Sequence, residues 1–519
     1  MKVAKFQIAK NEASTNAFLF YVKRTRPTAA QTASARISPQ SYNYFLVTQH
    51  SHAVFLRVLL TTDTADRAKA KIWMANFTKI ENNLLTLQRL NDISPMDNYK
   101  PRIVDELLQY RLEEVGAVLI EGPKWCGKTT TAEQHAKSIL YLANPANLTQ
   151  NLELARINPS LILEGATPRL IDEWQLAPEL WDAVRFEVDH RRKEGQFILT
   201  GSAVPPKGDK INHTGTGRFA WLSMRPMSLW ESGDSSGDIS LKALFQGESI
   251  QGSVNQKNLT DIAFLTCRGG WPASIGKSER AALRLPYNYL DAVVRSDVSR
   301  VDNTLRDPER IKSLLRSYAR LQGAQASAEV IRDDMGGNEN DKPALNTIYS
   351  YISALEKIFV IENMKAWNPN LRSKTTIRSS DTRYFVDPSI AAAALGIGPQ
   401  DLINDLNTFE LLFETLCVRD LRVYADSLDG NVYHYRDKSG LECDTVVHLR
   451  NGDYGLIEIK LGGDNLIEHG VSTLTTLASK IDTDKMKKPA FLMVLTAVGN
   501  YAYQRKDGIW IVPITCLKN

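Results

Sequence analysis

Ala117-Val-Leu-Ile-Glu-Gly-Pro-Lys-Trp-Cys-Gly-Lys-Thr129 is the stretch that decides the fold of this chain. Its first four residues form an apolar run of the kind found in buried strands. From Gly122 to Thr129 it matches the pattern G-x-x-x-x-G-K-[ST] in full. The glycines of such a loop let the backbone wrap around a phosphate, so that N–H groups and the positive end of the next helix face the anion. The stretch therefore predicts a strand, a phosphate-binding loop (P-loop) and a helix in succession.

The loop residues have distinct expected roles. Lys128 is expected to reach the β- and γ-phosphates of a nucleotide, and Thr129 to bind its Mg²⁺. The remaining predicted nucleotide-binding residues are Gly122, Pro123, Lys124, Trp125, Cys126, Gly127 and Thr130. The alternative is a chance Gly-Lys-Thr turn, but the strand before it and the helix after it favour the P-loop.

Two further strand ends supply the groups that hydrolysis needs. Arg169-Leu-Ile-Asp-Glu173 ends in two acids; Asp172 is expected to hold the Mg²⁺ shell, and Glu173 to orient or deprotonate the attacking water. Phe197-Ile-Leu-Thr-Gly-Ser202 ends in hydroxyls that are expected near the γ-phosphate, with Thr200 as a catalytic candidate. A cap at the end of the strand is the other interpretation of Thr200.

Arg218, in Thr216-Gly-Arg-Phe219, is a candidate arginine finger. Such a residue adds positive charge where phosphoryl charge develops in the transition state. An ordinary surface arginine fits the sequence nearly as well. If the finger acts in trans, the protein is a homo-oligomer, either a ring or a dimer.

The order of predicted strands and helices around the P-loop indicates the fold class. Helical patterns over Ile103–Val115 and from the P-loop to Lys137 alternate with short apolar strands, among which we place Leu161–Leu163. Alternating strands and helices predict an α/β fold, in which a P-loop NTPase parallel sheet carries helices on both faces.

Bulk properties narrow the class of protein. A chain of 519 residues predicts two to four domains. We find no apolar run long enough to span a bilayer, so no membrane partner is expected. The five cysteines are scattered without CxxC spacing, which indicates neither a zinc site nor a disulfide framework and fits a reducing cytosol.

The net charge of +4 is unevenly distributed along the chain. Residues 1–95 hold 13 Lys and Arg against 5 Asp and Glu, which leaves the remainder slightly acidic and gives no support to strong nonspecific nucleic-acid binding. Residues 1–60 contain one acid, Glu12, and are expected to be poorly ordered, whereas Ala65–Leu90 has a helical pattern. The segment resembles a transit peptide in composition without a clean amphipathic helix; an upstream extension before a start at Met96 is the alternative.

The block from Tyr99 to about Trp230 resembles the AAA-superfamily ATPases of bacteria and archaea that carry a C-terminal domain of unknown function, of the type numbered 4143. Three further stretches match the recurring pattern of that family: Arg268-Gly-Gly-Trp-Pro272, Trp367-Asn-Pro-Asn-Leu-Arg372, and Tyr384-Phe-Val-Asp387 with Ala391-Ala-Ala-Ala-Leu-Gly396. The resemblance covers roughly residues 99–465. It implies ATP binding, ATP hydrolysis and a prokaryotic cytoplasmic protein, and it is the basis for preferring ATP to GTP.

The middle of the chain is expected to form a helical, winged-helix-like module. Ser327–Met335 and Ala344–Leu355 are the two helices of its helix-turn-helix pair. The second helix carries no Arg or Lys before Lys357, and the segment between the helices is acidic. Phosphate contacts are essential for DNA binding, so a structural or protein-contact role is favoured over DNA reading.

The C-terminal region contains a second chemical pattern. Asp444, Glu458 and Lys460 spell D…E-x-K, the pattern of restriction-endonuclease-like folds, and the C-terminal domain of the family resembles that fold. Two carboxylates of this kind bind Mg²⁺, and the lysine positions water or stabilises charge. If Asn451–Asp453 is a three-residue hairpin loop, Asp444 lies directly opposite Lys460 and all three side chains share a face. Glu414 matches a position at which the family carries an acid on a preceding helix.

Together these patterns predict four blocks: an atypical extension (1–95), an AAA-type ATPase domain (96–260), a helical winged-helix-like module (261–365) and an α/β restriction-endonuclease-like domain (366–519). The leading hypothesis is an Mg²⁺-dependent ATPase that acts as a nucleotide-driven switch coupled to the last domain. An ATP-regulated, Mg²⁺-dependent DNA nuclease and a non-catalytic ATP-binding interaction module are the alternatives. The DNA or protein partner is not identified by the sequence.

Overall fold

The computed structural model describes residues 99–202, 215–248, 253–301, 304–336, 342–368 and 380–519, with the backbone of three strands nearer the amino terminus. The chain divides into two units, Met1–Asp92 and Ile93–Asn519. In the first unit, β1 (Ile8–Ala9), β2 (Ala17–Tyr21) and β3 (Tyr44–Thr48) pair in an antiparallel sheet. The helix expected over Ala65–Leu90, like most of residues 1–60, lies outside the described residues.

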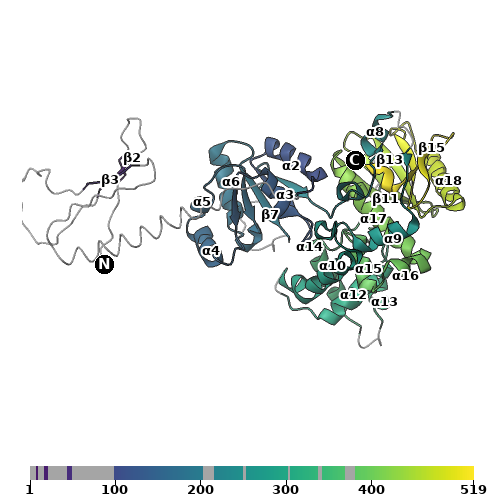
Figure 1. The fold of residues 1–519 in the computed structure, drawn as a ribbon, viewed down its shortest axis with the longest axis horizontal. Coiled ribbons are helices and arrows are strands. Elements are labelled where there is room, and N and C mark those ends of the chain that lie inside the picture. Colours follow the sequence, from purple (N-terminus) through teal and green to yellow (C-terminus); the bar gives the residue numbers. More distant parts are fainter. Residues whose placement is uncertain are drawn as a thin grey trace, which may run out of the picture. The chain divides into compact units, whose positions relative to one another are not determined.

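A five-stranded sheet forms the first part of the second unit (Figure 1). All of its pairings are parallel. Its strands, in spatial order, are β5 (Ser138–Tyr141), β6 (Arg169–Asp172), β7 (Phe197–Gly201), β4 (Ala117–Glu121) and β8 (Phe219–Ser223). Because every strand runs the same way, all five carboxyl ends lie at one edge.

Helices cover both faces of this sheet. Val118 and Ile120 point into one apolar cluster, with side chains of α2 (Ile103–Glu114) and α3 (Lys128–His135). Ala117 and Leu119 point into the other, with side chains of α4, α5 and α6. Those helices span Leu148–Ile157, Pro159–Ile162 and Leu180–Arg191. The strand is buried on both faces, which is why it reads as an unbroken apolar run, and the predicted α/β class is confirmed.

One predicted strand is wrong. Leu161–Leu163 lies at the helix α5, where Pro159 occupies the first turn and presets the helical backbone angle. The sheet instead takes β5 at Ser138–Tyr141, an edge strand whose short, half-polar sequence gives a weak strand signal.

The segment after β8 crosses to the carboxyl-terminal part of the chain. α7 (Leu229–Ser232) is followed by β9 (Ile239–Ser240), α8 (Leu241–Gln246) and β10 (Ser253–Val254). β9 pairs with β17 (Leu517–Lys518), and β10 pairs with β15 (Tyr501–Gln504). β9 and β10 belong to the block expected to end at residue 260, yet both pair with strands near the carboxyl terminus.

A helical module comes next. It comprises α9 (Leu259–Arg268), α10 (Glu279–Ala292), the π-helix η4 (Val293–Asp297), α11 (Val298–Arg300), α12 (Pro308–Arg320), α13 (Ala328–Asp334) and α14 (Leu345–Lys357). α15 (Pro388–Leu395) packs on α9, α10 and α12, and α16 (Pro399–Asn404) packs on α9. The expected boundary at residues 365–366 therefore lies too early. The winged-helix interpretation of α13 and α14 stays a prediction.

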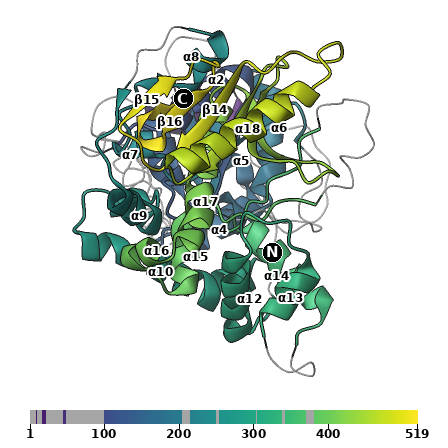
Figure 2. The same ribbon diagram turned by 90° about the vertical axis from the view of Figure 1, so that its right-hand side faces the viewer.

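The C-terminal domain is built on a seven-stranded mixed sheet, in the order β10-β15-β16-β14-β13-β12-β11. Its other strands are β11 (Gly430–Arg436), β12 (Glu442–Leu449), β13 (Tyr454–Lys460), β14 (Phe491–Thr496) and β16 (Trp510–Pro513). α17 (Leu406–Asp426) packs on one face and α18 (Asp464–Lys480) on the other. Figure 2 shows α17 between this sheet and the helical module, and its inner residues pack against both.

The stretches 268–272 and 384–387, both noted in the sequence for their family resemblance, contact each other next to α17. The Gly270 N–H donates to Asp387 Oδ2 at 2.9 Å, and the indole of Trp271 donates to Ser389 Oγ at 2.9 Å. Arg419 of α17 also pairs with Asp387, at 2.9 Å, and both side chains are almost fully buried. A Cβ at Gly270 would lie 2.1 Å from the Met227 carbonyl oxygen, so only glycine fits. These stretches are structural joints between the helical module and α17.

Gly270→Ala is expected to destabilise the protein by roughly 3 kcal/mol, because the added methyl group meets backbone that cannot move aside. Urea unfolding followed by circular dichroism measures the change. Gly398→Ala is the control, since the nearest atom to a Cβ there is 3.9 Å away on an aspartate side chain. Equal stability of the two variants would contradict the close packing at Gly270.

Candidate nucleotide site

The P-loop connects β4 to α3 in a conformation that requires glycine. Gly122 and Gly127 have φ angles of 153° and 104°. A Cβ at Gly122 would lie 2.0 Å from the Met224 carbonyl oxygen, at the end of β8. Trp125 also has a positive φ, 66°, which is uncommon for a residue with a side chain. The loop is therefore held in one tight shape by its neighbours.

The amino end of α3 is shaped to receive an anion. Gly127 is the N-cap and has no side chain to bond the first N–H groups of the helix. Uncapped N–H groups and the helix dipole together form an anion site. The Lys128 ammonium donates to the carbonyls of Gly122 and Pro123, at 2.9 Å and 2.8 Å, so it lies across the same loop.

Asp172 lies at the centre of a cluster of hard oxygen ligands. Its Oδ1 accepts hydrogen bonds from Thr129 Oγ1 and Thr200 Oγ1, each at 2.7 Å. Asp172 and Thr200 are register partners on β6 and β7, so parallel pairing brings them together at the carboxyl edge. Hydroxyl and carboxylate oxygens are the ligands that Mg²⁺ prefers, and this set fits that ion.

Glu173 follows Asp172 in a strained backbone position. Its φ and ψ are 57° and 44°, in the left-handed region. Its carboxylate accepts from the Gln175 amide and, at 3.4 Å, from Ser202 Oγ, while its N–H donates to Thr200 Oγ1 at 3.4 Å. Left-handed backbone in a residue with a side chain costs about 1 kcal/mol, and such positions cluster at functional sites. Gln175 gave no signal in the sequence. It lies two residues after Glu173, and the turn at Glu173 brings the two side chains together.

The structure does not bring Arg218 to the P-loop of its own chain. Arg218 precedes β8, and its carbonyl accepts from the N–H of Ala117, the first residue of β4. It therefore lies at the amino edge, separated from the P-loop by the five-residue length of β4, roughly 16 Å. Its guanidinium pairs with Asp189 at 2.8 Å, and its side chain is 44% exposed. A role at this nucleotide site within one chain is excluded, and only the role in trans remains as a proposal.

Other P-loop side chains face away from the phosphate position, toward the helical module. Lys124 Nζ lies 2.7 Å from Asp297 Oδ1, in the π-helix η4, and the Trp125 ring meets the edge of Tyr289 with centroids 5.6 Å apart. From the other side, the buried Arg102 donates to the Cys126 carbonyl at 2.8 Å. No local pattern predicts these contacts, because the partners lie far apart in the sequence.

Asp444, Glu458 and Lys460 form a compact cluster in the C-terminal domain. Lys460 Nζ lies 3.0 Å from Asp444 Oδ2 and 2.9 Å from Glu458 Oε2. The expected register is wrong by two residues: His448 pairs with Tyr454, which places Glu458, rather than Lys460, level with Asp444. The hairpin loop spans five residues instead of three, because Leu449 and Asp453 close the turn without joining the ladder. An even shift keeps side chains on the same face, so the three still meet.

Glu414 of α17 faces this cluster. It accepts a hydrogen bond from the Tyr384 hydroxyl, a contact that the sequence analysis missed. Burial, followed by the charge of Asp444, raises the pKa of the Glu414 carboxyl; the same two causes raise the pKa of Glu458. The Lys460 ammonium opposes these shifts. In the part of the chain that the structure describes, no group of three or more His, Cys, Asp or Glu side chains is placed to hold a metal ion.

The acidic side chains near the helix-turn-helix pair are partly neutralised. Asp333 pairs with Arg332 and Lys342 at 3.2 Å and 3.3 Å, and Asp334 pairs with Arg320. Glu339 and Asp341 of the same segment lie outside the described residues.

In the described residues, no helix combines the length and the apolar character needed to cross a membrane.

Three family models match the chain. Residues 115–232 match an AAA domain, residues 259–401 match domain of unknown function 8612, and residues 409–517 match domain of unknown function 4143. Uncharacterized proteins of Mycobacterium bovis and Mycobacterium tuberculosis are each 23% identical over 366 residues, which are 68% of this chain and 72% of theirs.

Solved structures resemble the chain more distantly. A Walker-type ATPase of Pyrococcus abyssi is 14% identical with a TM-score of 0.36, over 59% of this chain and 99% of that one. AMPPCP-bound DnaA of Aquifex aeolicus is 15% identical with a TM-score of 0.22, over 50% of this chain and 89% of that one.

Proposed function

The chain joins an AAA domain to a C-terminal domain of unknown function 4143, and we propose that it is an Mg²⁺-dependent ATPase that acts as a nucleotide-driven switch. The observation that carries the proposal is the meeting of Thr129, Asp172 and Thr200 beside the amino end of α3. An anion-binding helix end and a cluster of hard oxygens lie next to each other, as phosphoryl transfer requires.

Each residue then has a task at the bound nucleotide. The N–H groups of Gly122–Thr130 hold the phosphates, and Lys128 leaves the loop carbonyls to reach the β- and γ-oxygens. Thr129 and Asp172 hold the Mg²⁺, which neutralises charge on the phosphates when it is bound. Thr200 keeps the Asp172 carboxylate oriented and presents its own hydroxyl at the γ-phosphate end of the site.

Glu173 is the group we assign to the attacking water. Gln175 and Ser202 fix its carboxylate at the carboxyl edge of the sheet, one residue beyond Asp172. A carboxylate held in this way accepts a proton from water or orients it for in-line attack. A binding module without hydrolysis would have no use for a strained acid at this position.

Glu173→Gln is expected to bind ATP normally and to lose turnover about 100-fold or more, because the amide cannot accept the proton. Lys128→Ala is expected to lose nucleotide binding itself. Phosphate release and a fluorescent ATP analogue measure the two properties, and Glu194→Gln, an exposed acid on the loop after α6, is the control. Negligible turnover in the wild type together with intact ATP binding would favour the non-catalytic interaction module.

A homo-oligomer follows if Arg218 completes the nucleotide site of a neighbouring subunit. Arg218 immediately precedes β8, the edge strand of the sheet, and its exposed guanidinium pairs with Asp189. In a second copy placed against this edge, the guanidinium would reach the γ-phosphate bound there and stabilise its developing charge.

An equimolar mixture tests this arrangement. Arg218→Ala is expected to bind ATP with turnover reduced about 1,000-fold, and Lys128→Ala to be inactive. When mixed, Lys128→Ala subunits supply Arg218 to intact P-loops, so phosphate release should exceed the mean of the separate variants severalfold. Full activity of Arg218→Ala alone would leave Arg218 as the partner of Asp189 and nothing more.

Other parts of the proposal concern what the switch serves. Nucleotide binding would alter the arrangement of the helical module and the C-terminal domain, whose DNA or protein partner is unidentified. The five cysteines are buried and unpaired, which supports a reducing cytoplasm. The lack of basic residues along most of α14 favours a protein partner for the α13–α14 pair.

A Mg²⁺-dependent nuclease is the second candidate function. Asp444, Glu458 and Lys460 favour it, since two carboxylates bridged by a lysine match the D…E-x-K chemistry. Glu414 would be the fourth member.

DNA cleavage in the presence of Mg²⁺ decides between the two functions. If the nuclease is real, Glu458→Ala should lose cleavage about 100-fold while its ATP binding is unchanged, because the carboxylate that helps to hold the metal is removed. Glu442→Ala is the matched control, an exposed acid on β12 that pairs with Arg436. Wild-type protein that leaves single- and double-stranded DNA intact would exclude the nuclease.

A further inference from the structure

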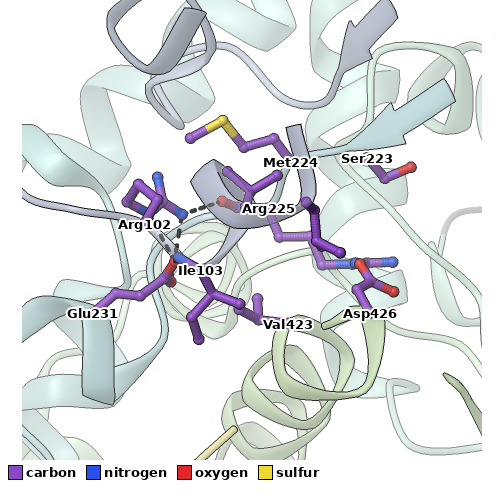
Figure 3. A pocket seen from close by; sticks show the side chains of 10 residues that line it. Arg102, Ile103, Ser223, Met224, Arg225, Glu231, Val423 and Asp426 are labelled. Carbon is purple, nitrogen blue, oxygen red and sulfur yellow. Dashed lines mark hydrogen bonds and ion pairs between the residues drawn. The ribbon is translucent and has the colours of Figure 1, made fainter. Parts of the chain in front are cut away.

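Arg102 holds the P-loop through a backbone carbonyl of the loop. Arg102 immediately precedes α2, and its Nη1 donates to the Cys126 carbonyl at 2.8 Å. In a planar trans peptide the carbonyl and the next N–H point in opposite directions, so the N–H of Gly127 is turned away from Arg102. This N–H belongs to the loop that receives the phosphates. The hydrogen bond therefore fixes the orientation of a phosphate-binding peptide without touching the phosphate. Figure 3 shows the other contacts of Arg102, with Glu231 and with the Arg225 carbonyl.

The Arg102 guanidinium also pairs with the buried carboxylate of Glu231. Arg102 Nε lies 3.0 Å from Glu231 Oε1, and the two side chains are 4% and 2% exposed. Glu231 also accepts from the N–H groups of Ile103 and Ser228, at 2.9 Å and 2.8 Å. Arg102 Nη2 donates to the Arg225 carbonyl at 2.9 Å. Removing either charge would leave the other buried without its partner, so the pair is a rigid connection.

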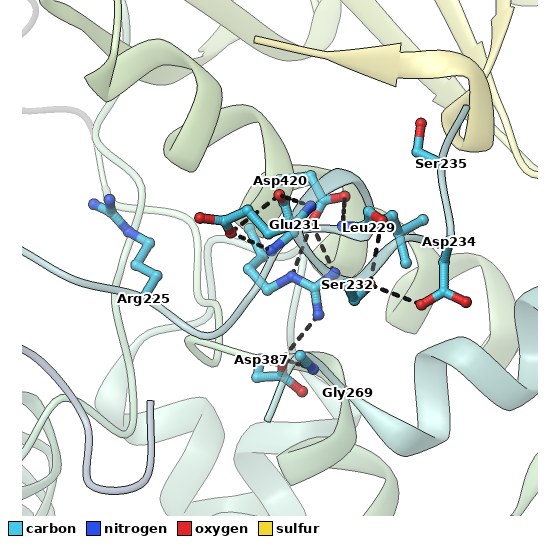
Figure 4. A network of polar contacts seen from close by, with 12 residues as sticks. Arg225, Leu229, Glu231, Ser232, Asp234, Ser235, Gly269, Asp387 and Asp420 are labelled. Atoms are coloured by element: carbon cyan, nitrogen blue, oxygen red, sulfur yellow. Dashed lines mark hydrogen bonds and ion pairs between the residues drawn. The ribbon is translucent and has the colours of Figure 1, made fainter. Parts of the chain in front are cut away.

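The segment that provides Glu231 and Arg225 is anchored to α17 at two points. The N–H of Leu229, which opens α7, donates to Asp420 Oδ2 at 2.9 Å. The Arg225 guanidinium pairs with Asp426 of α17 and, at 2.6 Å, with Glu362. Figure 4 shows the polar network in which Glu231, Leu229 and Asp420 lie together. The path from P-loop to α17 thus consists of a carbonyl, a guanidinium, a carboxylate and a short helix.

α17 in turn carries Glu414, the acid that faces Asp444 and Lys460 in the C-terminal domain. Asp420 and Asp426 lie six and twelve residues further along the same helix, about 9 Å and 18 Å at 1.5 Å per residue. One helix therefore contacts the P-loop support with its carboxyl-terminal half and packs on β12 and β13, the strands that carry Asp444, Glu458 and Lys460.

We propose that Arg102 is a positioning residue of the nucleotide site, and that docking of α17 on residues 225–231 sets how firmly it holds the P-loop. The inference rests on the proposed function and names the regulation of that site. By linkage, whatever α17 gains or loses at the C-terminal domain changes nucleotide affinity, and nucleotide changes α17 by the same factor. Contacts of α17 within the C-terminal domain therefore influence the affinity of the ATP site.

Two arginine variants test the positioning role. Arg102→Ala is expected to raise the Kd and KM for ATP about tenfold, with kcat altered much less, because loop shape rather than Glu173 is affected. Arg102→Lys, which keeps the charge beside Glu231 but lacks the fork of donors, should fall between alanine and wild type. Arg316→Ala, an exposed arginine on α12, is the control. Thermal unfolding without nucleotide shows which variants are folded at the assay temperature.

An aspartate pair tests the link to α17 at a distance from the P-loop. Asp426→Asn removes the charge that holds Arg225 and is expected to weaken ATP binding about threefold by the linkage above. Asp484→Asn is the matched control, an exposed acid beyond α18 that lies outside α2, α7 and α17. Wild-type Kd values in both Arg102→Lys and Asp426→Asn would overturn the inference and leave the ATPase intact. Failure of the wild type to bind ATP would instead overturn the proposed function.

Discussion

Parallel pairing of β6, β7 and β4 is the constraint on which the nucleotide site depends. The pairing places Asp172 level with Thr200, and it brings the carboxyl end of β4, with the P-loop, to the same edge. Side-chain packing against helices on both faces holds that edge in place, since the strands are buried on each side. Five side chains carry the proposed chemistry at this edge, those of Lys128, Thr129, Asp172, Glu173 and Thr200, and the backbone provides the rest of the anion site.

Buried charge connects this edge to the rest of the chain. Arg102 with Glu231, Arg225 with Glu362 and Asp426, and Arg419 with Asp387 are ion pairs between different segments of the chain. Such pairs add little net stability, but breaking one leaves an unpaired buried charge. The pairs therefore specify which segments contact each other, and the proposed nucleotide-driven change would have to alter them.

Local patterns predicted the α/β class, and they singled out Thr129, Asp172 and Thr200, which the structure brings together. The P-loop and the Asp172–Glu173 strand end are short motifs whose chemistry is contained in consecutive residues. Leu161–Leu163 was predicted wrongly because three apolar residues satisfy a strand and a helical turn alike, and Pro159 decides for the helix. The β12–β13 register depended on the length of a loop that no residue type specifies. For Arg218 the sequence left a finger and a surface arginine open, since its distance from its own P-loop depends on strand order and direction, which are not local properties. Arg102 gave no signal, because its partners lie 24, 123 and 129 residues away.

A structure of the protein with Mg²⁺ and a non-hydrolysable ATP analogue is the most direct measurement of the central claim. The account predicts phosphates on the N–H groups of Gly122–Thr130, Lys128 released from its loop carbonyls, and the metal between Thr129, Asp172 and the phosphates. It also predicts Glu173 beside the position of the attacking water. A nucleotide bound elsewhere, or a P-loop that stays empty at saturating analogue, would contradict the account.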